Sequence, residues 1–145
     1  MESEIIKYPF RIQGSNRRFP FASVVVVDNI AYVSGMTAIP LNADEELTVT
    51  IENQMWVALT SMKLALEEAG SCLNNVFKTL ILLKDIRDFM DMRATERKFY
   101  HEYAPELIEY PPASTMFQAA MSNPKFIVEI ECMAVVNRRS YSGEG

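Results

Sequence analysis

The sequence predicts an α+β fold in which two helices cover one face of a largely antiparallel β-sheet. Two segments, 50–70 and 88–103, repeat apolar residues at helical spacing. Six shorter segments are rich in strand-forming residues, and their order with the helices is three strands, a helix, a strand, a helix and two strands. Two helices against so many strands are typical of an α+β layer.

The first three strands are expected at residues 5–12, 22–27 and 30–34. The second is a run of valines, as in buried strands. Asp28 and Asn29 favour a tight turn, so the second and third strands should form a hairpin. Gly35 is expected to end or bend the third strand, and the polar stretch 40–48 should be a loop.

The first helix is the strongest local prediction. Thr50 is a suitable N-terminal cap, and Gly70 stands where a left-handed residue commonly follows a helix. One face of the segment is apolar throughout, and it comprises Ile51, Met55, Ala58, Leu59, Met62, Ala65, Leu66 and Ala69.

The second half of the chain should contribute strands at 76–84, 113–119 and 126–136, with a helix at 88–103. Asp85 or Asp88 is expected to cap this helix. Its apolar stripe consists of Phe89, Met92, Phe99 and Tyr103. Three prolines, at 105, 111 and 112, are expected to prevent further helix before the next strand.

Length and composition indicate one globular domain, which we assign to residues 1–136, followed by a flexible polar tail at 137–145. The chain has 145 residues, of which 49% are hydrophobic and 23% charged. A net charge of −5 argues against a nucleic-acid partner, because phosphate binding needs clustered lysine and arginine.

The cysteines and the histidine exclude several kinds of site. Cys72 and Cys132 are too few for a disulfide framework, and we expect both to be buried and reduced in the cytoplasm. The sequence shows neither a basic leader nor a long apolar run, so we expect no membrane partner. His101 is the single histidine, which excludes a multi-histidine metal site within one chain, and its polar helical surroundings favour a surface position.

Several strands carry apolar residues on both sides, although two helices can cover only one face of the sheet. A second copy of the chain is the natural cover for the other face. Self-association therefore follows from the pattern, whereas the number of subunits does not.

Short motifs in a fixed order make the chain similar to the RidA/YjgF family. They include Val-Ser-Gly at 33–35, Tyr-Pro-Pro-Ala-Ser-Thr at 110–115 and Val-Glu-Ile-Glu at 128–131. The resemblance extends over residues 20–136 and implies a chorismate-mutase-like fold, a homotrimer and clefts between subunits. It also implies a small-molecule substrate, since members hydrolyse enamines and imines to ketones and ammonia without a metal or cofactor.

The resemblance implies a catalytic role for Glu129, the glutamate that handles a water molecule. It places Ser34, Gly35, Ser114 and Thr115 at positions that hold the reacting end of the substrate. Without the resemblance, Glu129 and Glu131 would be read as two carboxylates on a solvated strand face.

Three positions depart from the family pattern and mark altered substrate binding. Ala113 replaces an arginine that binds the substrate carboxylate, and Phe21 replaces a pocket tyrosine. Arg93 stands where many members have an asparagine near the cleft. Either Arg93 faces the cleft and holds an anion, or it pairs with Glu96 on the helix surface.

Two functions therefore remain open. The first is a cofactor-independent deaminase, or a related hydrolase or tautomerase, acting on a bulkier or neutral conjugated molecule. The alternative is a non-catalytic trimer that binds a metabolite or another protein.

Overall fold

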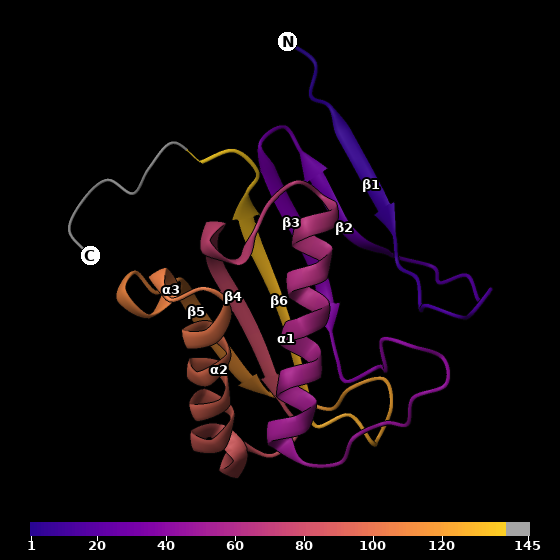
Figure 1. Cartoon of the computed structure of the whole chain (residues 1–145), viewed down its shortest axis with the longest axis vertical. Coiled ribbons are helices and arrows are strands. Elements are labelled where there is room, and N and C mark those ends of the chain that lie inside the picture. Colours follow the sequence, from indigo (N-terminus) through magenta and orange to yellow (C-terminus); the bar gives the residue numbers. More distant parts are fainter. Residues whose placement is uncertain (139–145) are drawn as a thin grey trace.

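A computed structural model of the chain describes residues 1–138 as one sheet with helices packed on it (Figure 1). Residues 139–145, most of the tail expected to be flexible, lie outside the described residues. The strands are β1 (Ile5–Pro9), β2 (Ala22–Val27), β3 (Ile30–Met36), β4 (Val76–Leu83), β5 (Ala113–Gln118) and β6 (Val128–Val135). Their order across the sheet is β1-β2-β3-β6-β4-β5, and only the β4–β5 pair is parallel among the described strands.

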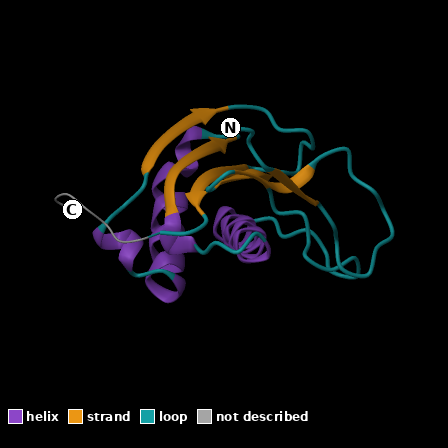
Figure 2. Ribbon diagram, turned by 90° about the horizontal axis from the view of Figure 1, so that it is seen from above, coloured by secondary structure: helices purple, strands orange, loops and turns teal. Residues whose placement is uncertain are grey.

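The two long helices are α1 (Ile51–Glu68) and α2 (Phe89–Tyr103), and both lie on the same side of the curved sheet (Figure 2). The opposite side of the sheet carries no helix within the described chain. The α+β arrangement with helices on one face is therefore confirmed. We call the uncovered side the bare face.

Helix α1 forms as its sequence predicts. The Thr50 hydroxyl accepts a hydrogen bond from the backbone N–H of Asn53 at 3.1 Å, which caps the first turn. All eight residues of the predicted apolar stripe are buried. Gly70 has φ +81°, the left-handed conformation expected after a helix.

The β2–β3 hairpin turns at Asp28, whose φ of 53° is left-handed. Farther along β3 the register with β6 shifts between Val33 and Met36, so the strand bends at Gly35 as expected. This irregularity matters for the site, since it opens backbone space at a position that faces β6.

Several expectations from the sequence are wrong. Neither aspartate caps α2: Asp88 makes no capping hydrogen bond, and the Asp85 carboxylate accepts one from the backbone N–H of Arg87 before the helix begins. A one-turn helix, α3 (Glu106–Glu109), follows Pro105, which has helical dihedral angles and precedes the helix instead of preventing it. Cys72 is exposed, because it lies in the turn after α1, whereas Cys132 on β6 is buried as expected. The first strand ends at Pro9, where its register with β2 is already irregular.

Residues 1–138 include no helix with the length and apolar character needed to cross a membrane. The single histidine, His101, lies on the exposed side of α2 as expected.

Candidate functional site

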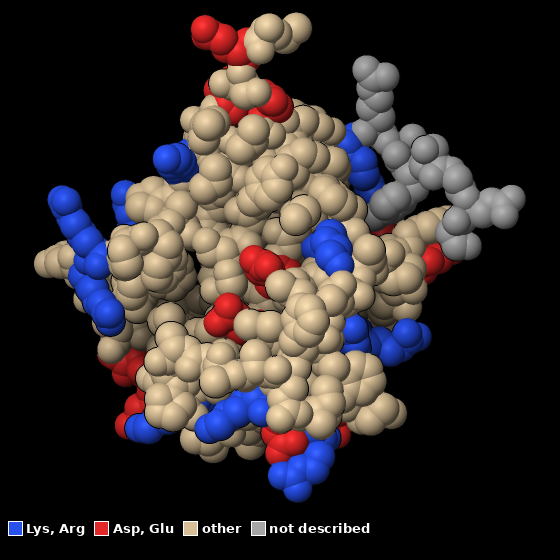
Figure 3. Space-filling view, turned by 180° about the vertical axis from the view of Figure 1, so that it is seen from behind, with Lys and Arg blue, Asp and Glu red and all other residues tan. Residues whose placement is uncertain are grey.

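Strand β6 places two carboxylates on the bare face. Val128, Ile130 and Cys132 are buried on the helix side, and Glu129 and Glu131 alternate with them. Viewed from behind, this face is largely uncharged, with acidic atoms and a neighbouring basic group near its middle (Figure 3). The sharing of one strand face by Glu129 and Glu131 is therefore confirmed.

Glu129 packs directly against the backbone of Gly35. A β-carbon built on Gly35 would overlap Oε2 of Glu129 and would lie 2.8 Å from its Cδ. Any larger residue at position 35 would therefore displace the carboxylate, and the bend in β3 keeps this space open. Glycine at this position allows the carboxylate to approach the backbone closely.

The pKa of Glu129 is raised above its usual value. Partial burial is the larger cause, because it disfavours the charged form, and the neighbouring negative charge of Glu131 adds to it. Within residues 1–138, no lysine or arginine forms an ion pair with Glu129 to oppose these effects.

Glu129 lines a hollow of about 310 Å³ together with seven other residues. They are Phe21, Ser34, Gly35, Thr37, Ile39, Ser122 and Phe126. We call this the Glu129 hollow. Among the described residues that line it, Glu129 is the one charged side chain. The structure thus brings together Glu129 and three of the predicted binding residues, namely Phe21, Ser34 and Gly35.

Hydrogen bonds hold the rim of the Glu129 hollow in place. The Ser34 hydroxyl donates to the carbonyl of Ala22 at 2.6 Å, which joins β3 to the start of β2. The hydroxyl oxygen keeps a lone pair with which it can accept a further hydrogen bond. The backbone beside Phe21 is therefore fixed relative to Gly35.

Arg93 belongs to a different region. Its Nη1 donates to Oε1 of Glu96 at 2.7 Å, and its Nη2 donates to the Ser114 hydroxyl at 2.9 Å. We call Arg93, Glu96 and Ser114 the Arg93 cluster. The pairing with Glu96, one of the two alternatives from the sequence, is confirmed. The guanidinium lies on the helix side of β5.

The three predicted residues on β5 do not share a face. Ser114 bonds to Thr79, which is fully buried under the helices, at 3.1 Å between their hydroxyl oxygens. Ala113 and Thr115 alternate with Ser114 and lie on the bare face, where the Thr115 hydroxyl accepts a hydrogen bond from Lys78 Nζ at 2.6 Å.

Register separates the Glu129 hollow from the Arg93 cluster. Glu129 pairs with Leu82 on β4, whereas Ser114 pairs with Thr79, three residues back along the same strand. Across the sheet, Glu129 and Ser114 are two strands apart, at about 4.8 Å for each strand. Along the strands they are three residues apart, at about 3.3 Å for each residue. Within one chain, the predicted site residues therefore form three groups. Glu129 lies with Phe21, Ser34 and Gly35, and Arg93 lies with Ser114 on the opposite side of the sheet. Ala113 and Thr115 lie on the bare face but outside the Glu129 hollow.

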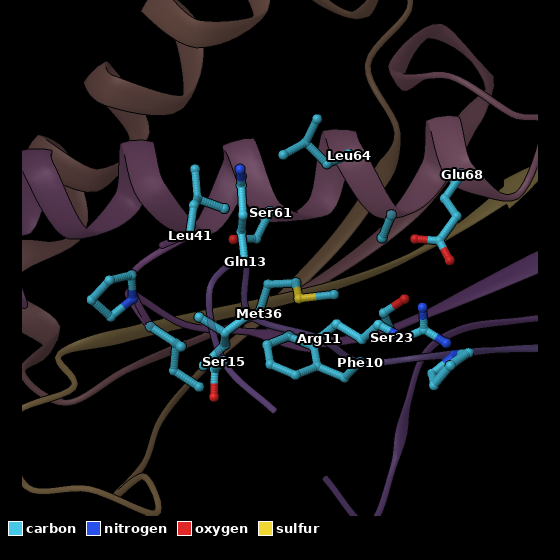
Figure 4. A pocket seen from close by; sticks show the side chains of 15 residues that line it. Phe10, Arg11, Gln13, Ser15, Ser23, Met36, Leu41, Ser61, Leu64 and Glu68 are labelled. Carbon is cyan, nitrogen blue, oxygen red and sulfur yellow. The ribbon is translucent and has the colours of Figure 1, made fainter. Parts of the chain in front are cut away.

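Another hollow, of about 400 Å³, lies between α1 and the loops that flank β1 and β3 (Figure 4). Phe10 and Leu64 contribute apolar surface to it, and Arg11 and Glu68 contribute charge. None of the residues predicted for the site lines this hollow. Among residues 1–138, no group of three or more histidine, cysteine, aspartate or glutamate side chains is arranged to hold a metal ion.

The Glu129 hollow also contains four residues that the sequence did not indicate: Thr37, Ile39, Ser122 and Phe126. Phe126 was expected in a strand, but β6 begins at Val128, so Phe126 belongs to the preceding loop. The loop residue Ser122 carries no sequence signal that points to a site. Thr37 and Ile39 directly follow the Val-Ser-Gly motif, and their proximity to it was the available signal.

The arrangement around Glu129 supports proton transfer. A carboxylate with a raised pKa, at the wall of a partly apolar hollow, can accept a proton from water and return it within one reaction. The Ser34 and Thr37 hydroxyls offer hydrogen-bonding groups beside it, and Phe21, Ile39 and Phe126 provide apolar surface.

Known proteins match most of this chain. The family model described as endoribonuclease L-PSP matches residues 15–136. A RutC family protein of Pyrococcus abyssi is 30% identical over 115 residues, which cover 79% of this chain and 85% of that protein. The human protein named 2-iminobutanoate/2-iminopropanoate deaminase is 29% identical over 116 residues, which cover 80% of each chain.

Solved structures show the same fold. A protein of Entamoeba histolytica described as an endoribonuclease L-PSP superposes with a TM-score of 0.75 at 26% identity, covering 91% of this chain and 99% of that one. The YjgF gene product of E. coli gives a TM-score of 0.74 at 24% identity, covering 87% of this chain and 94% of that one.

Proposed function

This chain belongs to the endoribonuclease L-PSP family, which includes the RidA and YjgF proteins, and from that premise we propose that it hydrolyses an imine or enamine. Relatives at 28–30% identity are named 2-iminobutanoate/2-iminopropanoate deaminases. The observation that carries the proposal is the Glu129 carboxylate, seated against Gly35 in a hollow that raises its pKa.

The reaction requires one water molecule and one proton shuttle. Ionised Glu129 removes a proton from water as the water oxygen bonds to the imine carbon and the C=N π bond opens. The protonated carboxyl then returns the proton to nitrogen. Glu129 next removes the proton of the new hydroxyl group and passes it to the nitrogen, so that the carbon–nitrogen bond breaks as the C=O bond forms, and ammonia and a ketone leave. An enamine first takes a proton on carbon and enters the same sequence as the imine.

The raised pKa of Glu129 suits both halves of this cycle. General acid–base catalysis is most efficient when the pKa of the group approaches the working pH, and partial burial moves this carboxyl in that direction. A fully solvated glutamate would be a weaker base at neutral pH and would rarely be protonated.

The substrate range we propose differs from that of relatives that bind a small carboxylate. Position 113, where the family pattern has an arginine, is alanine here, and no cation lines the described part of the Glu129 hollow. Without a charge-assisted bond of about 1.5–3 kcal/mol, a small anionic substrate loses affinity. A bulkier or neutral conjugated substrate does not suffer this loss.

We also propose that the working form is a cytoplasmic homotrimer with its hollows at the clefts between subunits. The bare face in one chain exposes Phe117 and Met133, and β5 is an edge strand. A neighbouring copy covers such a face. It also carries a second Arg93 cluster and a second Ala113 toward the Glu129 hollow, where Arg93 retains its proposed role in holding an anion.

The test is ammonia release from imines generated in solution by an amino-acid oxidase. Glu129→Gln keeps the size of the side chain and removes its basicity, so kcat should fall by about 100-fold or more. Glu131→Gln is the matched control, because it alters the next carboxylate on the same strand face, and it should retain most activity at neutral pH.

Two outcomes contradict the proposal. Equal activity of the wild-type protein and Glu129→Gln removes Glu129 from the mechanism. Absence of ammonia release above the uncatalysed rate from every imine and enamine offered leaves the non-catalytic binding trimer as the function.

A further inference from the structure

Phe21 stands at the rim of the Glu129 hollow with much of its ring uncovered. Its exposed fraction is 44%, although it lines the cavity that holds the candidate catalytic group. An aromatic ring gains free energy when another flat group covers it, through apolar burial and ring–ring contact. The uncovered face of Phe21 is therefore available to a flat group that enters the Glu129 hollow.

Two further phenylalanines hold Phe21 from the side that the chain covers. The centroid of the Phe10 ring is 5.2 Å from that of Phe21, and the centroid of the Phe19 ring is 5.7 Å from that of Phe21. Phe10 and Phe19 also contact each other edge to face at 4.8 Å. We call Phe10, Phe19 and Phe21 the aromatic platform. Since each ring contacts both others, Phe21 is held in place before any ligand arrives.

Backbone and charge contacts add to this support. The N–H of Phe10 donates to the carbonyl of Phe21 at 3.4 Å, so the two ends of the 10–21 loop are joined where the aromatic platform forms. Arg17 places its guanidinium carbon 4.6 Å from the centre of the Phe19 ring, a cation–π contact. A preordered aromatic surface binds with less loss of conformational entropy.

The remaining walls of the Glu129 hollow favour the same kind of ligand. Ile39 and Phe126 are apolar, whereas Ser34, Thr37 and Ser122 are small and polar. The single charge is negative. A compact anion would meet the Glu129 carboxylate without a compensating cation from this chain, whereas a flat apolar group would meet Phe21 on the outer side.

From these contacts we propose that the substrate carries a planar aromatic or conjugated group, which stacks on Phe21 while its C=N carbon lies at Glu129. The inference rests on the proposed hydrolysis, and it names the class of substrate. Phe21 acts as the specificity-determining residue. Phe10 and Phe19 act as positioning residues, since they reach the ligand only through Phe21.

The kinetic test compares two imines that differ by a phenyl group, made by oxidising alanine and phenylalanine. The wild-type protein should prefer the phenyl-bearing imine by about tenfold in kcat/KM, which corresponds to about 1.4 kcal/mol. Phe21→Ala should abolish this preference. Phe77→Ala is the matched control, because Phe77 is exposed to almost the same extent, 43%, and lies outside the Glu129 hollow; it should keep the preference.

A binding test separates this inference from the proposed hydrolysis. Phenylacetone and acetone are stable ketones that differ by the same phenyl group, and their dissociation constants can be measured by saturation-transfer NMR. Phenylacetone should bind at least tenfold more tightly than acetone to the wild-type protein and to Glu129→Gln, but not to Phe21→Ala. This result supports the aromatic surface even if no imine is hydrolysed.

Equal binding of the two ketones, or a preference that survives in Phe21→Ala, would overturn the proposal. Phe19→Leu tests the supporting role of the aromatic platform. It should reduce the preference for the phenyl group while retaining ammonia release from both imines, and an unchanged preference would show that Phe21 needs no support.

Discussion

The Glu129 hollow and the Arg93 cluster each hold a charged side chain of the predicted site. The charge of Glu129 has no partner of opposite sign in the described chain, whereas the charge of Arg93 has one. Glu129 is partly buried without a counter-charge from the described chain, and its pKa is raised. Arg93 is paired with Glu96 and bonded to Ser114. The charge of Glu129 is unopposed within its own chain, whereas the charge of Arg93 is already paired and helps to hold α2 on β5.

This contrast follows from the position of each residue on the sheet. Glu129 lies on the bare face of a central strand, beside the gap left by Gly35. Arg93 lies over the edge strand on the helix side, where Glu96, with 8% exposure, needs a cation. The same sheet therefore separates a carboxylate without a counter-charge from a guanidinium that is already paired.

The largest effect that tests this contrast is expected at Gly35. In Gly35→Ala the new methyl group would overlap the Glu129 carboxylate and displace it, and a displacement of about 1 Å can cost about 100-fold in rate. Steady-state ammonia release measures the loss. Glu129→Asp shortens the acid and makes room for the methyl group. Gly35→Ala should therefore lower the rate much less in a Glu129→Asp protein than in the wild-type protein. Equal costs in the two backgrounds would show that the methyl group acts elsewhere.

The next effect is a gain at Ala113. Ala113→Arg restores a guanidinium on the bare face of β5, where the resemblance to the family places the carboxylate-binding arginine. A charge-assisted bond of about 1.5–3 kcal/mol should raise kcat/KM for 2-iminopropanoate by tenfold or more. Ala113→Gln has similar length without the charge and should give no such gain. If both variants behave alike, Ala113 lies away from the bound substrate.

The smallest effect concerns the Arg93 cluster. Arg93→Gln leaves Glu96 buried without its cation and should lower the free energy of unfolding by about 1 kcal/mol, measured by urea denaturation. Arg97→Gln alters an exposed arginine on the same helix and should change it by less than about 0.5 kcal/mol. A large rise in KM for anionic imines in Arg93→Gln alone would show that the arginine binds substrate as well.

Much of the fold was predictable, since local patterns determine it. The apolar stripe and caps of α1 and the alternation along β6 identify these elements and the faces they bury. The helix α3 does not follow from the sequence pattern, because Pro105 can either stop a helix or stand at the start of one. The turn that exposes Cys72 depends on how α1 meets β4, which no local pattern specifies.

The candidate site was only partly predictable. Strand alternation implies that Ser114 and Thr115 face opposite sides of the sheet, so both could not line one hollow in a single chain. The proximity of Gly35 to Glu129 depends on pairing between β3 and β6, which are far apart in the sequence. Phe126 and Ser122 join the site through a loop, where the sequence gives no periodic signal.

The pH dependence of kcat/KM tests most directly whether partly buried Glu129 is the working base. Activity requires the ionised carboxylate, so it should fall as the pH drops through a pKa above the ordinary value of 4.5. Because Glu131 contributes to that raised pKa, Glu131→Gln should move the acidic limb to lower pH. An acidic limb that stays in place in Glu131→Gln, and that persists in the residual activity of Glu129→Gln, would contradict this account.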